Sequence, residues 1–488
     1  MARAPQPESA FSTAPTSGSV VPLYVDLDGT LVATDLLWEG VVLLLRSNPG
    51  QIWGLIAALT RGRAALKAEV ARLAVPDPKT LPYRAGTLAL VREAQAAGRP
   101  VILATAAAEP HARAIAEYVG GFSAVLSSNA ERNLTGRTKL AAIQEHAQGP
   151  FDYAGDESRD QPIMAAARTS YLVAPNGRVP HKRAGQKPPI IIPRPSRWRS
   201  FARALRPHQW SKNLLVFAPA LLAHRILDPE TLLRCVVAFA SFSLAASGTY
   251  LLNDFLDISA DRIHPTKRRR PFASGDLPLA AGVVGGPLLL LIGLAGAIPL
   301  GRGFVLLLLT YVAMSQAYTL TLKQQPVLDV LTLSALYSVR IFAGAVAAGV
   351  AVSAWLLAFS SFLFLSLAFA KRYEELLELK GEGPREVMGR GYEAGDTQLV
   401  LALGPASGYL AVLVFALYTY SDAVRALYLR PGMLWLEAPL LLYWVTRLWF
   451  LTHRGKLGAD PVIFAVRDPV SYVIAVLAAL VIGAAGPL

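Results

Sequence analysis

Long apolar runs fill the second half of the chain, whereas the first half alternates short apolar segments with helical patterns. The long runs predict nine membrane-spanning helices, because about 20 apolar residues in a helix cross a bilayer. These runs lie at about residues 213–228, 231–252, 280–300, 303–322, 328–350, 353–371, 397–420, 433–452 and 470–486. The first of them is short and is interrupted by Pro219.

The alternating pattern of residues 21–180 predicts a soluble α/β domain. Val21–Val25 and Pro100–Ala104 are short apolar segments typical of buried strands, and helical patterns separate them, as in a parallel sheet. Residues 35–85 predict a mostly helical insertion, whose tryptophans and leucines we assign to packing rather than to a binding surface. The expected fold is an N-terminal α/β domain with a Rossmann-like parallel sheet, followed by an all-α membrane bundle.

The segments around these two domains are polar. Residues 1–20 are rich in Pro, Ser, Ala and Thr and contain no apolar signal-peptide core, so we expect a disordered tail. Residues 181–200 are rich in Pro, Lys and Arg and predict a linker to the membrane domain at 201–488. At that junction, Arg197–Lys212 combine aromatic and basic residues, which indicates an amphipathic helix lying on the membrane surface.

Composition supports a multi-pass membrane protein with a soluble part, since 53% of the 488 residues are apolar and only 17% are charged. The net charge of +13 could favour nucleic acid. However, the cations sit beside apolar segments, so anionic lipid and phosphorylated substrates are the expected partners and nucleic acid is not. Cys235 is the single cysteine, which excludes an intrachain disulfide and a cysteine metal cage.

The basic residues between the predicted spans are unevenly distributed. The loops that follow even-numbered spans hold most of the lysines and arginines, including Lys323 and the run Lys267–Arg270. Because such loops remain on the cytoplasmic side, we predict a cytoplasmic N-terminus in an inner or plasma membrane. The soluble domain and the loop after the second span then share the cytoplasmic face.

An acidic stretch, Asn253–Arg270, closes the second predicted span. If the helix continues through it, Asn253, Asp254, Asp257 and Asp261 project from one face, since they are three or four residues apart. Aligned carboxylates at a membrane boundary need a cation, and hard oxygen ligands suit Mg²⁺. The basic residues just downstream would bind the phosphates of a substrate. The alternative is a solvated helix end with a positive anchor, which explains the cations but not the aligned carboxylates.

Four polar signals follow one another in the soluble domain. They are Asp26 with Asp28 at a strand end, Thr105 at a later strand end, Lys139, and Asp156 with Asp160. This ordered set resembles the haloacid dehalogenase (HAD) superfamily of phosphatases over roughly residues 20–180. The resemblance implies that Asp26 is the nucleophile, Asp28 the general acid and base, and that Thr105 and Lys139 neutralise the transferred phosphoryl group. It also implies Mg²⁺ held by Asp26, Asp28, Asp156 and Asp160. The alternative is an inactive phosphatase-like domain kept as a scaffold.

The membrane part, about residues 200–488, resembles the UbiA superfamily of intramembrane transferases. Asn253-Asp254-x-x-Asp257-x-x-x-Asp261 matches the first Asp-rich motif of that superfamily. Within it, Arg206–Asn213, Asp261–Pro271 and Lys371–Glu375 are most similar to the decaprenyl-phosphate phosphoribosyltransferase branch. The resemblance implies catalytic Asp254 and Asp257, with Mg²⁺ on the four motif residues. It implies substrate binding by Lys212, Asn213, Lys267, Arg268, Arg270, Tyr318, Lys323, Arg340, Lys371, Arg372 and Glu375. For Arg340, inside an apolar span, a structural ion pair is the alternative.

One departure bears on the substrate. Members that use prenyl diphosphates carry a second Asp-rich motif, whereas this chain has Lys371-Arg372-Tyr-Glu-Glu375 there. The added cations suit phosphoribosyl diphosphate, which is more anionic than a prenyl diphosphate. Three functions stay open: transfer of 5-phosphoribose to a polyprenyl phosphate, prenyl transfer from a prenyl diphosphate to a small acceptor, and a non-catalytic lipid carrier. In the first, the fused phosphatase-like domain is expected to dephosphorylate the product.

Overall fold

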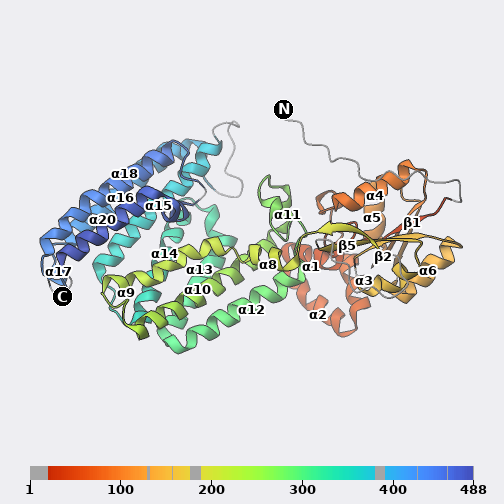
Figure 1. The fold of residues 1–488 in the computed structure, drawn as a ribbon, viewed down its shortest axis with the longest axis horizontal. Coiled ribbons are helices and arrows are strands. Elements are labelled where there is room, and N and C mark those ends of the chain that lie inside the picture. Colours follow the sequence, from red (N-terminus) through yellow and green to blue (C-terminus); the bar gives the residue numbers. More distant parts are fainter. Residues whose placement is uncertain are drawn as a thin grey trace. The chain divides into compact units, whose positions relative to one another are not determined.

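The computed structural model describes residues 20–128, 132–156, 158–175, 188–379, 391–425, 427–458 and 460–486. The chain forms two compact units (Figure 1). The first comprises residues 1–201 together with 254–281, and the second comprises residues 202–253 together with 282–488. The acidic stretch after the second predicted span therefore groups with the N-terminal domain. The predicted tail lies outside the described residues except for Val20.

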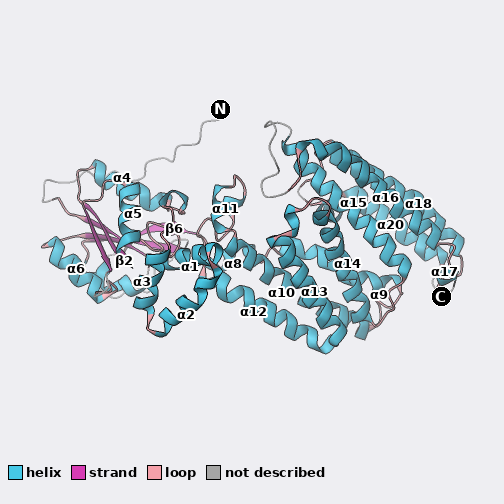
Figure 2. Cartoon of the chain, turned by 180° about the vertical axis from the view of Figure 1, so that it is seen from behind, coloured by secondary structure: helices cyan, strands magenta, loops and turns pink. Residues whose placement is uncertain are grey.

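A six-stranded parallel sheet forms the centre of the first unit (Figure 2). The strands are β1 Leu23–Val25, β2 Val101–Ala108, β3 Ala124–Ser128, β4 Asp152–Gly155, β5 Thr169–Pro175 and β6 Ile190–Arg194. Their order is β3-β2-β1-β4-β5-β6, with parallel pairing throughout. This confirms the predicted α/β fold and puts β1 in the middle, where the carboxyl ends of neighbouring strands meet.

Helices cover both faces of this sheet. Those of the first unit are α1 Leu36–Ser47, α2 Ile52–Thr60, α3 Arg63–Leu73, α4 Ala85–Ala96, α5 Glu109–Val119, α6 Arg137–Ala147, α7 Gln161–Ala166 and α11 Ile258–Ile263. Val91 of α4 and Ile115 of α5 pack on one face of β1 and β2. Ile143 of α6 and Ile163 of α7 pack on the other. Strands buried on both faces explain why their sequences are continuously apolar.

Two sequence predictions need correction in this unit. Residues 190–194, assigned to the linker, form β6 because the run Ile190–Ile192 pairs with β5 at the sheet edge. The insertion at 35–85 is helical, as predicted, but its residues do more than pack together. Trp53 is 75% exposed, and Lys67 of α3 lines a pocket described below.

The second unit is a helical bundle. Its helices are α9 Ala218–Leu222, α10 Pro229–Leu256, α12 Ala280–Ala297, α13 Arg302–Leu320, α14 Leu328–Ala348, α15 Ala354–Leu379, α16 Thr397–Tyr418, α17 Asp422–Arg425, α18 Glu437–His453, α19 Pro461–Arg467 and α20 Pro469–Ala485. Helices α10 and α12 each begin or end in the first unit. A short helix, α8 Arg197–Ala204, precedes the bundle and ends earlier than the predicted amphipathic helix.

Six helices in the described residues are long and apolar enough to cross a membrane: α10, α12, α13, α14, α15 and α16. A seventh span arises if α19 and α20, bent by 75°, count as one. The predicted number of nine is therefore not confirmed. The predicted span at 213–228 is instead a 3-10 helix, Pro207–Phe217, followed by the five-residue α9. Pro219, in the first turn of α9, lacks the backbone N–H that would continue a longer helix. These helices make the protein a multi-pass integral membrane protein.

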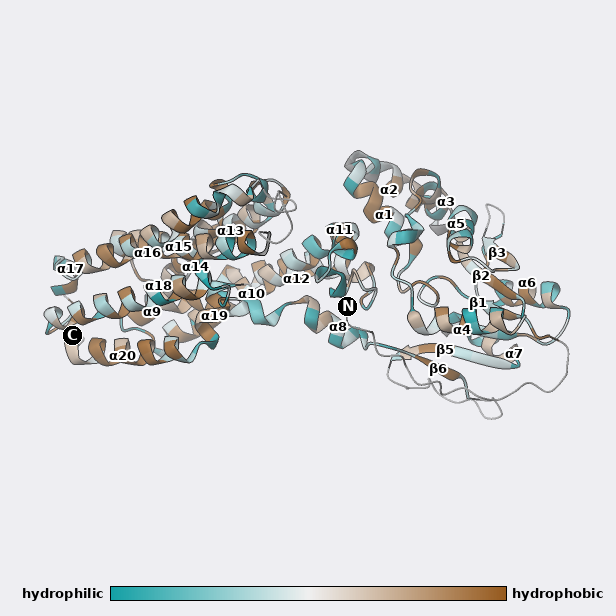
Figure 3. Cartoon of the chain, turned by 90° about the horizontal axis from the view of Figure 1, so that it is seen from above, coloured by the Kyte–Doolittle hydropathy of each residue, from teal (hydrophilic) through white to brown (hydrophobic). Residues whose placement is uncertain are grey.

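Burial separates the interior helices of the bundle from its outer ones. The apolar windows of α10 and α14 are 61% buried, against 22% for α12 and 17% for α13. The outer helices are rich in apolar residues (Figure 3). Leu291 of α12 and Leu306 of α13 are exposed, as expected of lipid-facing helices. Small residues allow close approach inside: a Cβ on Gly248 of α10 would lie 2.8 Å from the carbonyl oxygen of Gly286 of α12.

Candidate active sites

The first candidate centre lies where β1 ends. Asp26 follows Val25 directly, and its backbone N–H donates to the carbonyl oxygen of Ala154 on β4 (2.9 Å). The Asp26 side chain is buried, and its Oδ1 accepts a hydrogen bond from the backbone N–H of Leu27 (2.9 Å). The sheet thus fixes this carboxylate through backbone contacts on both sides.

Lys139 joins two predicted carboxylates of this centre. Its ammonium lies 3.0 Å from Oδ1 of Asp26 and 3.4 Å from Oδ1 of Asp160. Burial alone would lower the pKa of Lys139, but the carboxylates of Asp26 and Asp160 outweigh it and raise this pKa. Lys139 therefore lies beside Asp26, and its predicted role of neutralising a transferred phosphoryl group stays a prediction.

The pKa of Asp26 is raised to about 7, first by burial, although Lys139 acts to lower it. Burial also raises the pKa of Asp28 well above its usual range, and the nearby carboxylate of Asp35 adds to the rise. A carboxyl group protonated near neutral pH can donate a proton, as a general acid must. Asp28 Oδ1 accepts a hydrogen bond from the N–H of Leu36 (3.0 Å), which ties it to the start of α1.

The remaining predicted residues of this centre lie on its other strands. Thr105 was predicted at a strand end, but it lies within β2, which continues to Ala108. It is fully buried, and its hydroxyl accepts a hydrogen bond from the N–H of Ala107 (3.0 Å). Asp156 follows β4 and lies against Gly29, whose φ is +75°. A Cβ on Gly29 would lie 2.3 Å from Asp156 Oδ2, so only glycine allows this carboxylate to approach the Asp26–Asp28 turn.

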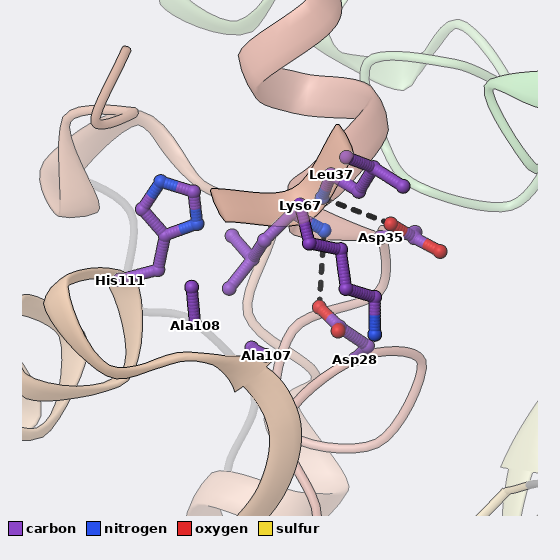
Figure 4. A pocket seen from close by; sticks show the side chains of 8 residues that line it. Asp28, Asp35, Leu37, Lys67, Ala107, Ala108 and His111 are labelled. Atoms are coloured by element: carbon purple, nitrogen blue, oxygen red, sulfur yellow. Dashed lines mark hydrogen bonds between the residues drawn. The ribbon is translucent and has the colours of Figure 1, made fainter. Parts of the chain in front are cut away.

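A pocket opens beside Asp28 (Figure 4). It is lined by Asp28, Asp35, Leu36, Leu37, Lys67, Ala107, Ala108 and His111. The Lys67 side chain passes beside the Asp28 carboxylate, and its ammonium donates to the carbonyl oxygen of Ala106 (3.0 Å). The sequence analysis missed Lys67 and His111. No local pattern marks them, since helix packing alone brings them to Asp28.

The second candidate centre is the acidic stretch. The sequence predicted one continuous helix here, but the structure contains a break. Helix α10 ends at Leu256, Asp257 lies in the break, and α11 begins at Ile258. The break separates Asp254 from Asp261, yet both stay buried and both contact Arg270. Arg270 Nη1 lies 3.2 Å from Asp254 Oδ1 and 2.7 Å from Asp261 Oδ2. The Arg270 guanidinium therefore holds Asp254 and Asp261 close together, a role that the sequence analysis had assigned to helical spacing.

Three other cations of the acidic stretch, Lys267, Arg268 and Arg269, are exposed. They lie in a short 3-10 helix, Lys267–Arg269. Burial raises the pKa of Asp261, although the Arg270 guanidinium acts to lower it. Arg262 turns away from these cations and pairs with Glu39 of α1, a partner that the sequence analysis did not foresee.

Each centre contains a buried oxygen atom that remains available to bind a hard cation. Asp160 Oδ2 in the first centre and Asn253 Oδ1 at the end of α10 are buried and have no hydrogen-bond partner among the described residues. The Asn253 amide nitrogen donates to the Thr319 hydroxyl (3.0 Å), which leaves its oxygen available. Within those residues, no group of three or more His, Cys, Asp or Glu is gathered as a metal cluster. Mg²⁺ needs few protein ligands, so these oxygen sets suit it.

Predicted substrate residues in the second unit form two buried groups. In the first, Arg372 of α15 is fully buried and lies 2.7 Å from Asp329 Oδ2 of α14. It also pairs with Glu375, while the Tyr318 hydroxyl donates to Asp329 Oδ1 (2.8 Å). Lys323 lies in the turn between α13 and α14, and Lys371 precedes Arg372 on α15. Arg372 is thus neutralised by Asp329 rather than left to a ligand.

The second buried group surrounds Arg340 of α14. Its Nε donates to Asn213 Oδ1 (2.9 Å) and its Nη2 to the Tyr311 hydroxyl (3.1 Å). Its guanidinium lies 4.7 Å from the centre of the Tyr311 ring. No salt bridge reaches Arg340 within the described part of the chain, so the structural ion pair is not formed there. Lys212, by contrast, pairs with Asp460, another partner that the sequence analysis missed.

Two family profiles match the chain. The UbiA prenyltransferase family matches residues 214–466, and the haloacid dehalogenase-like hydrolase family matches residues 23–165. Among solved structures, a UbiA homolog from Archaeoglobus fulgidus bound to DMAPP and Mg2+ is 18% identical, with a TM-score of 0.46. That match covers 58% of this chain and 99% of the homolog.

Curated relatives match both parts or the membrane part alone. The chain is 37% identical to the uncharacterized protein y4nM of Sinorhizobium fredii, over 94% of this chain and 90% of that protein. It is 38% identical to nodulation protein NoeC of Azorhizobium caulinodans, over 56% and 89% of the two chains. It is 34% identical to decaprenyl-phosphate phosphoribosyltransferase of Mycobacterium tuberculosis, over 58% and 93%. The chain therefore belongs to the UbiA prenyltransferase family and carries a haloacid dehalogenase-like domain on the N-terminal side of its membrane bundle.

Proposed function

We propose that this protein transfers 5-phosphoribose from phosphoribosyl diphosphate to a polyprenyl phosphate. The observation that carries the proposal is the acidic stretch, in which buried Asp254 and Asp261 share Arg270 next to exposed Lys267 and Arg268. The relative of Mycobacterium tuberculosis that bears this activity in its name aligns over 93% of its own length. The nine membrane spans expected from the sequence remain part of this proposal.

The basic residues of the acidic stretch suit a donor with several phosphates. Phosphoribosyl diphosphate carries a diphosphate and a 5-phosphate, and each needs cationic partners. Lys267 and Arg268 are exposed and can reach such groups, whereas Arg270 holds the carboxylates together. Arg340, with neutral partners inside the bundle, suits an anionic group of a substrate, because an uncompensated buried charge is costly.

In the proposed transfer, an oxygen of the lipid phosphate attacks C1 of the ribose. The C1–oxygen bond to the diphosphate breaks, and the diphosphate leaves with that electron pair. Lys267 and Arg268 bind the leaving diphosphate and stabilise its developing charge. Asn253, Asp254, Asp257 and Asp261 would hold Mg²⁺, which supplies further neutralisation of the diphosphate when bound.

The N-terminal domain is proposed to remove the 5-phosphate of the lipid product. Asp26 attacks the phosphorus, the bond to the ribose O5 breaks, and Asp28 gives a proton to that oxygen. Water then attacks the aspartyl phosphate, Asp28 takes its proton, and inorganic phosphate leaves. Lys139 neutralises charge on the transferring group, consistent with its 3.0 Å distance to Asp26. Asp26 and Asp156 would hold Mg²⁺ here, and Asp160 would support the metal shell.

Incubation of the purified protein with ribose-labelled phosphoribosyl diphosphate, Mg²⁺ and decaprenyl phosphate tests the transfer. We expect label to move into the lipid fraction, and no label to move when decaprenol replaces the phosphate. Labelled geranyl diphosphate with a small aromatic acceptor serves as the competing reaction. Transfer of the prenyl group in place of the ribose would refute the proposal.

The proposed reaction also requires the soluble domain and the acidic stretch to lie on the same side of the membrane. We propose that the soluble domain and the acidic stretch face the cytoplasm, following the distribution of basic residues in the loops. With Cys235 replaced by Ala, a cysteine at Gly395 should react with an impermeant reagent only from the cytoplasmic side. A cysteine at Gly432 should react only from outside. The reverse labelling would overturn the orientation.

A further inference from the structure

The acidic stretch of the membrane transferase makes a buried ion pair with the N-terminal domain. Arg262 lies 3.0 Å through Nη1 from Oε2 of Glu39, and 2.6 Å through Nη2 from Oε1. The two side chains are only 7% and 5% exposed. Such a two-pronged guanidinium–carboxylate contact fixes orientation as well as distance. Both residues belong to the first compact unit, so the contact lies inside it.

Two further contacts hold the same segment. Arg262 Nε donates to the carbonyl oxygen of Ala273 (3.2 Å), which closes the loop between α11 and residue 273. Gly275, with a φ of +73°, lies directly on Ala33, and a Cβ there would be 2.5 Å from that of Ala33. A larger residue at 275 would therefore push the acidic stretch off the N-terminal domain.

These contacts connect both candidate centres through one helix. Glu39 lies on α1, and the N–H of Leu36 at the start of α1 donates to Asp28 of the phosphatase centre (3.0 Å). At the other end of the connection, Arg262 directly follows Asp261, whose carboxylate contacts Arg270 (2.7 Å). Glu39 thus sits between the proposed proton donor of one reaction and the carboxylates of the other.

We propose that Glu39 and Arg262 are positioning residues for the transferase, which makes the phosphatase-like domain a required brace of the acidic stretch. This inference rests on the proposed transfer activity. Glu39 holds Arg262 away from the carboxylates next to it in the sequence and fixes α11 against α1. Without Glu39, the Arg262 cation is free to pair with those carboxylates and to compete with Mg²⁺ for them. The brace depends on the fold of the N-terminal domain and not on its hydrolytic activity.

The test uses the full-length protein in nanodiscs with the variants Glu39→Gln, Arg262→Lys and the exchanged pair Glu39→Arg/Arg262→Glu. The matched control is Glu69→Gln on α3, because the Glu69–Arg72 ion pair belongs to the same insertion but involves an Arg72 that is 67% exposed. Hydrogen–deuterium exchange of residues 258–275 is followed without substrate, and transfer is followed over a range of Mg²⁺ concentrations.

We expect Glu39→Gln to accelerate exchange in 258–275, to raise the Mg²⁺ concentration needed, and to slow maximal transfer about a hundredfold. The KM for the lipid should stay unchanged. Arg262→Lys keeps the charge but loses the two-pronged contact, so it should lie between Glu39→Gln and wild type. The exchanged pair should regain about tenfold over Glu39→Gln. Glu69→Gln should transfer at the wild-type rate.

The hydrogen–deuterium exchange measurement does not depend on the proposed transfer activity. If wild type transferred no phosphoribose, faster exchange in Glu39→Gln would still support the brace, and only the proposed function would fail. If residues 258–275 exchanged in Glu39→Gln at the wild-type rate, the bracing role would be refuted. Faster exchange with an unchanged transfer rate and Mg²⁺ requirement would overturn the positioning role. A variant that failed to fold would show a changed elution volume, and Arg262→Lys would then decide.

Discussion

The two carboxylate centres of this protein are built in opposite ways. Asp26 stands at the end of a central parallel strand and is held by backbone hydrogen bonds to Ala154 and within its own turn. Asp254 and Asp261 stand on either side of a helix break and are held by the side chain of Arg270. The first arrangement combines backbone hydrogen bonds of the sheet with the Lys139 ion pair, whereas the second is held by side-chain ion pairs.

This difference predicts different sensitivity to change. A carboxylate fixed by a sheet tolerates substitutions elsewhere, because the ladder hydrogen bonds are made by backbone atoms. A loop fixed by side-chain pairs responds to each of them, since a lost partner leaves a buried charge uncompensated. The acidic stretch therefore depends on residues far away in the sequence, such as Glu39.

The largest expected effect comes from removing the nucleophile. Asp26→Asn should slow dephosphorylation of the lipid by more than about a thousandfold while transfer stays unchanged, because only the phosphoryl step uses this carboxylate. Mass spectrometry of the lipid product should show the 5-phosphorylated species accumulating in the variant and the dephosphorylated species in wild type. Identical lipids from the two proteins would contradict a shared pathway for the two centres.

The second prediction concerns removal of a carboxylate from the acidic stretch. Asp257→Ala should slow transfer by about 10²–10³-fold, because the leaving diphosphate loses part of its electrostatic stabilisation. Dephosphorylation of pre-formed phosphoribosyl lipid should proceed at the wild-type rate. Asp422→Ala, which removes a fully exposed carboxylate, is the control. Together with Asp26→Asn, this variant would show two separable reactions, and loss of both activities in either variant would argue for one shared centre.

A ligand experiment sharpens the comparison further. Phosphoribosyl diphosphate with Mg²⁺ should stabilise the folded protein by about 2.7 kcal/mol at a hundredfold excess over Kd, since it binds only the folded state. Thermal unfolding in detergent measures this stabilisation. The effect should vanish in Asp257→Ala and persist in Asp26→Asn. Stabilisation by prenyl diphosphates alone would instead favour prenyl transfer.

The smallest effect concerns the pocket beside Asp28. Lys67→Ala should slow dephosphorylation of the lipid about tenfold, because the pocket loses its cation. Transfer should not change. Lys79→Ala, at an exposed position of the same domain, serves as the control and should behave as wild type. An unchanged dephosphorylation rate in Lys67→Ala would exclude this pocket from substrate recognition.

The local pattern of the sequence predicted the α/β fold of the phosphatase-like domain. An apolar run ends directly at Asp26, at the edge where parallel strands bring their carboxyl ends together. The strand end expected at Thr105 is not observed, because β2 continues to Ala108. The β6 strand escaped because the basic and proline residues around it are typical of a linker. Lys67 and His111 escaped because a tertiary contact between the insertion and the sheet brings them to the pocket.

In the membrane part, hydropathy predicted the six long apolar helices α10 and α12 to α16, since bilayer thickness sets the length of a span, but the predicted number of nine spans is not confirmed. The sequence also marked Asp254, Asp257 and Asp261 by their spacing. Only the tertiary structure decided that the helix breaks at Asp257 and that Arg270 gathers two of the carboxylates. Spacing describes a single helix, whereas the choice among several nearby cations depends on which side chains the fold brings within reach. For the same reason, no pattern along the chain revealed that Arg262 pairs with Glu39, more than two hundred residues before it.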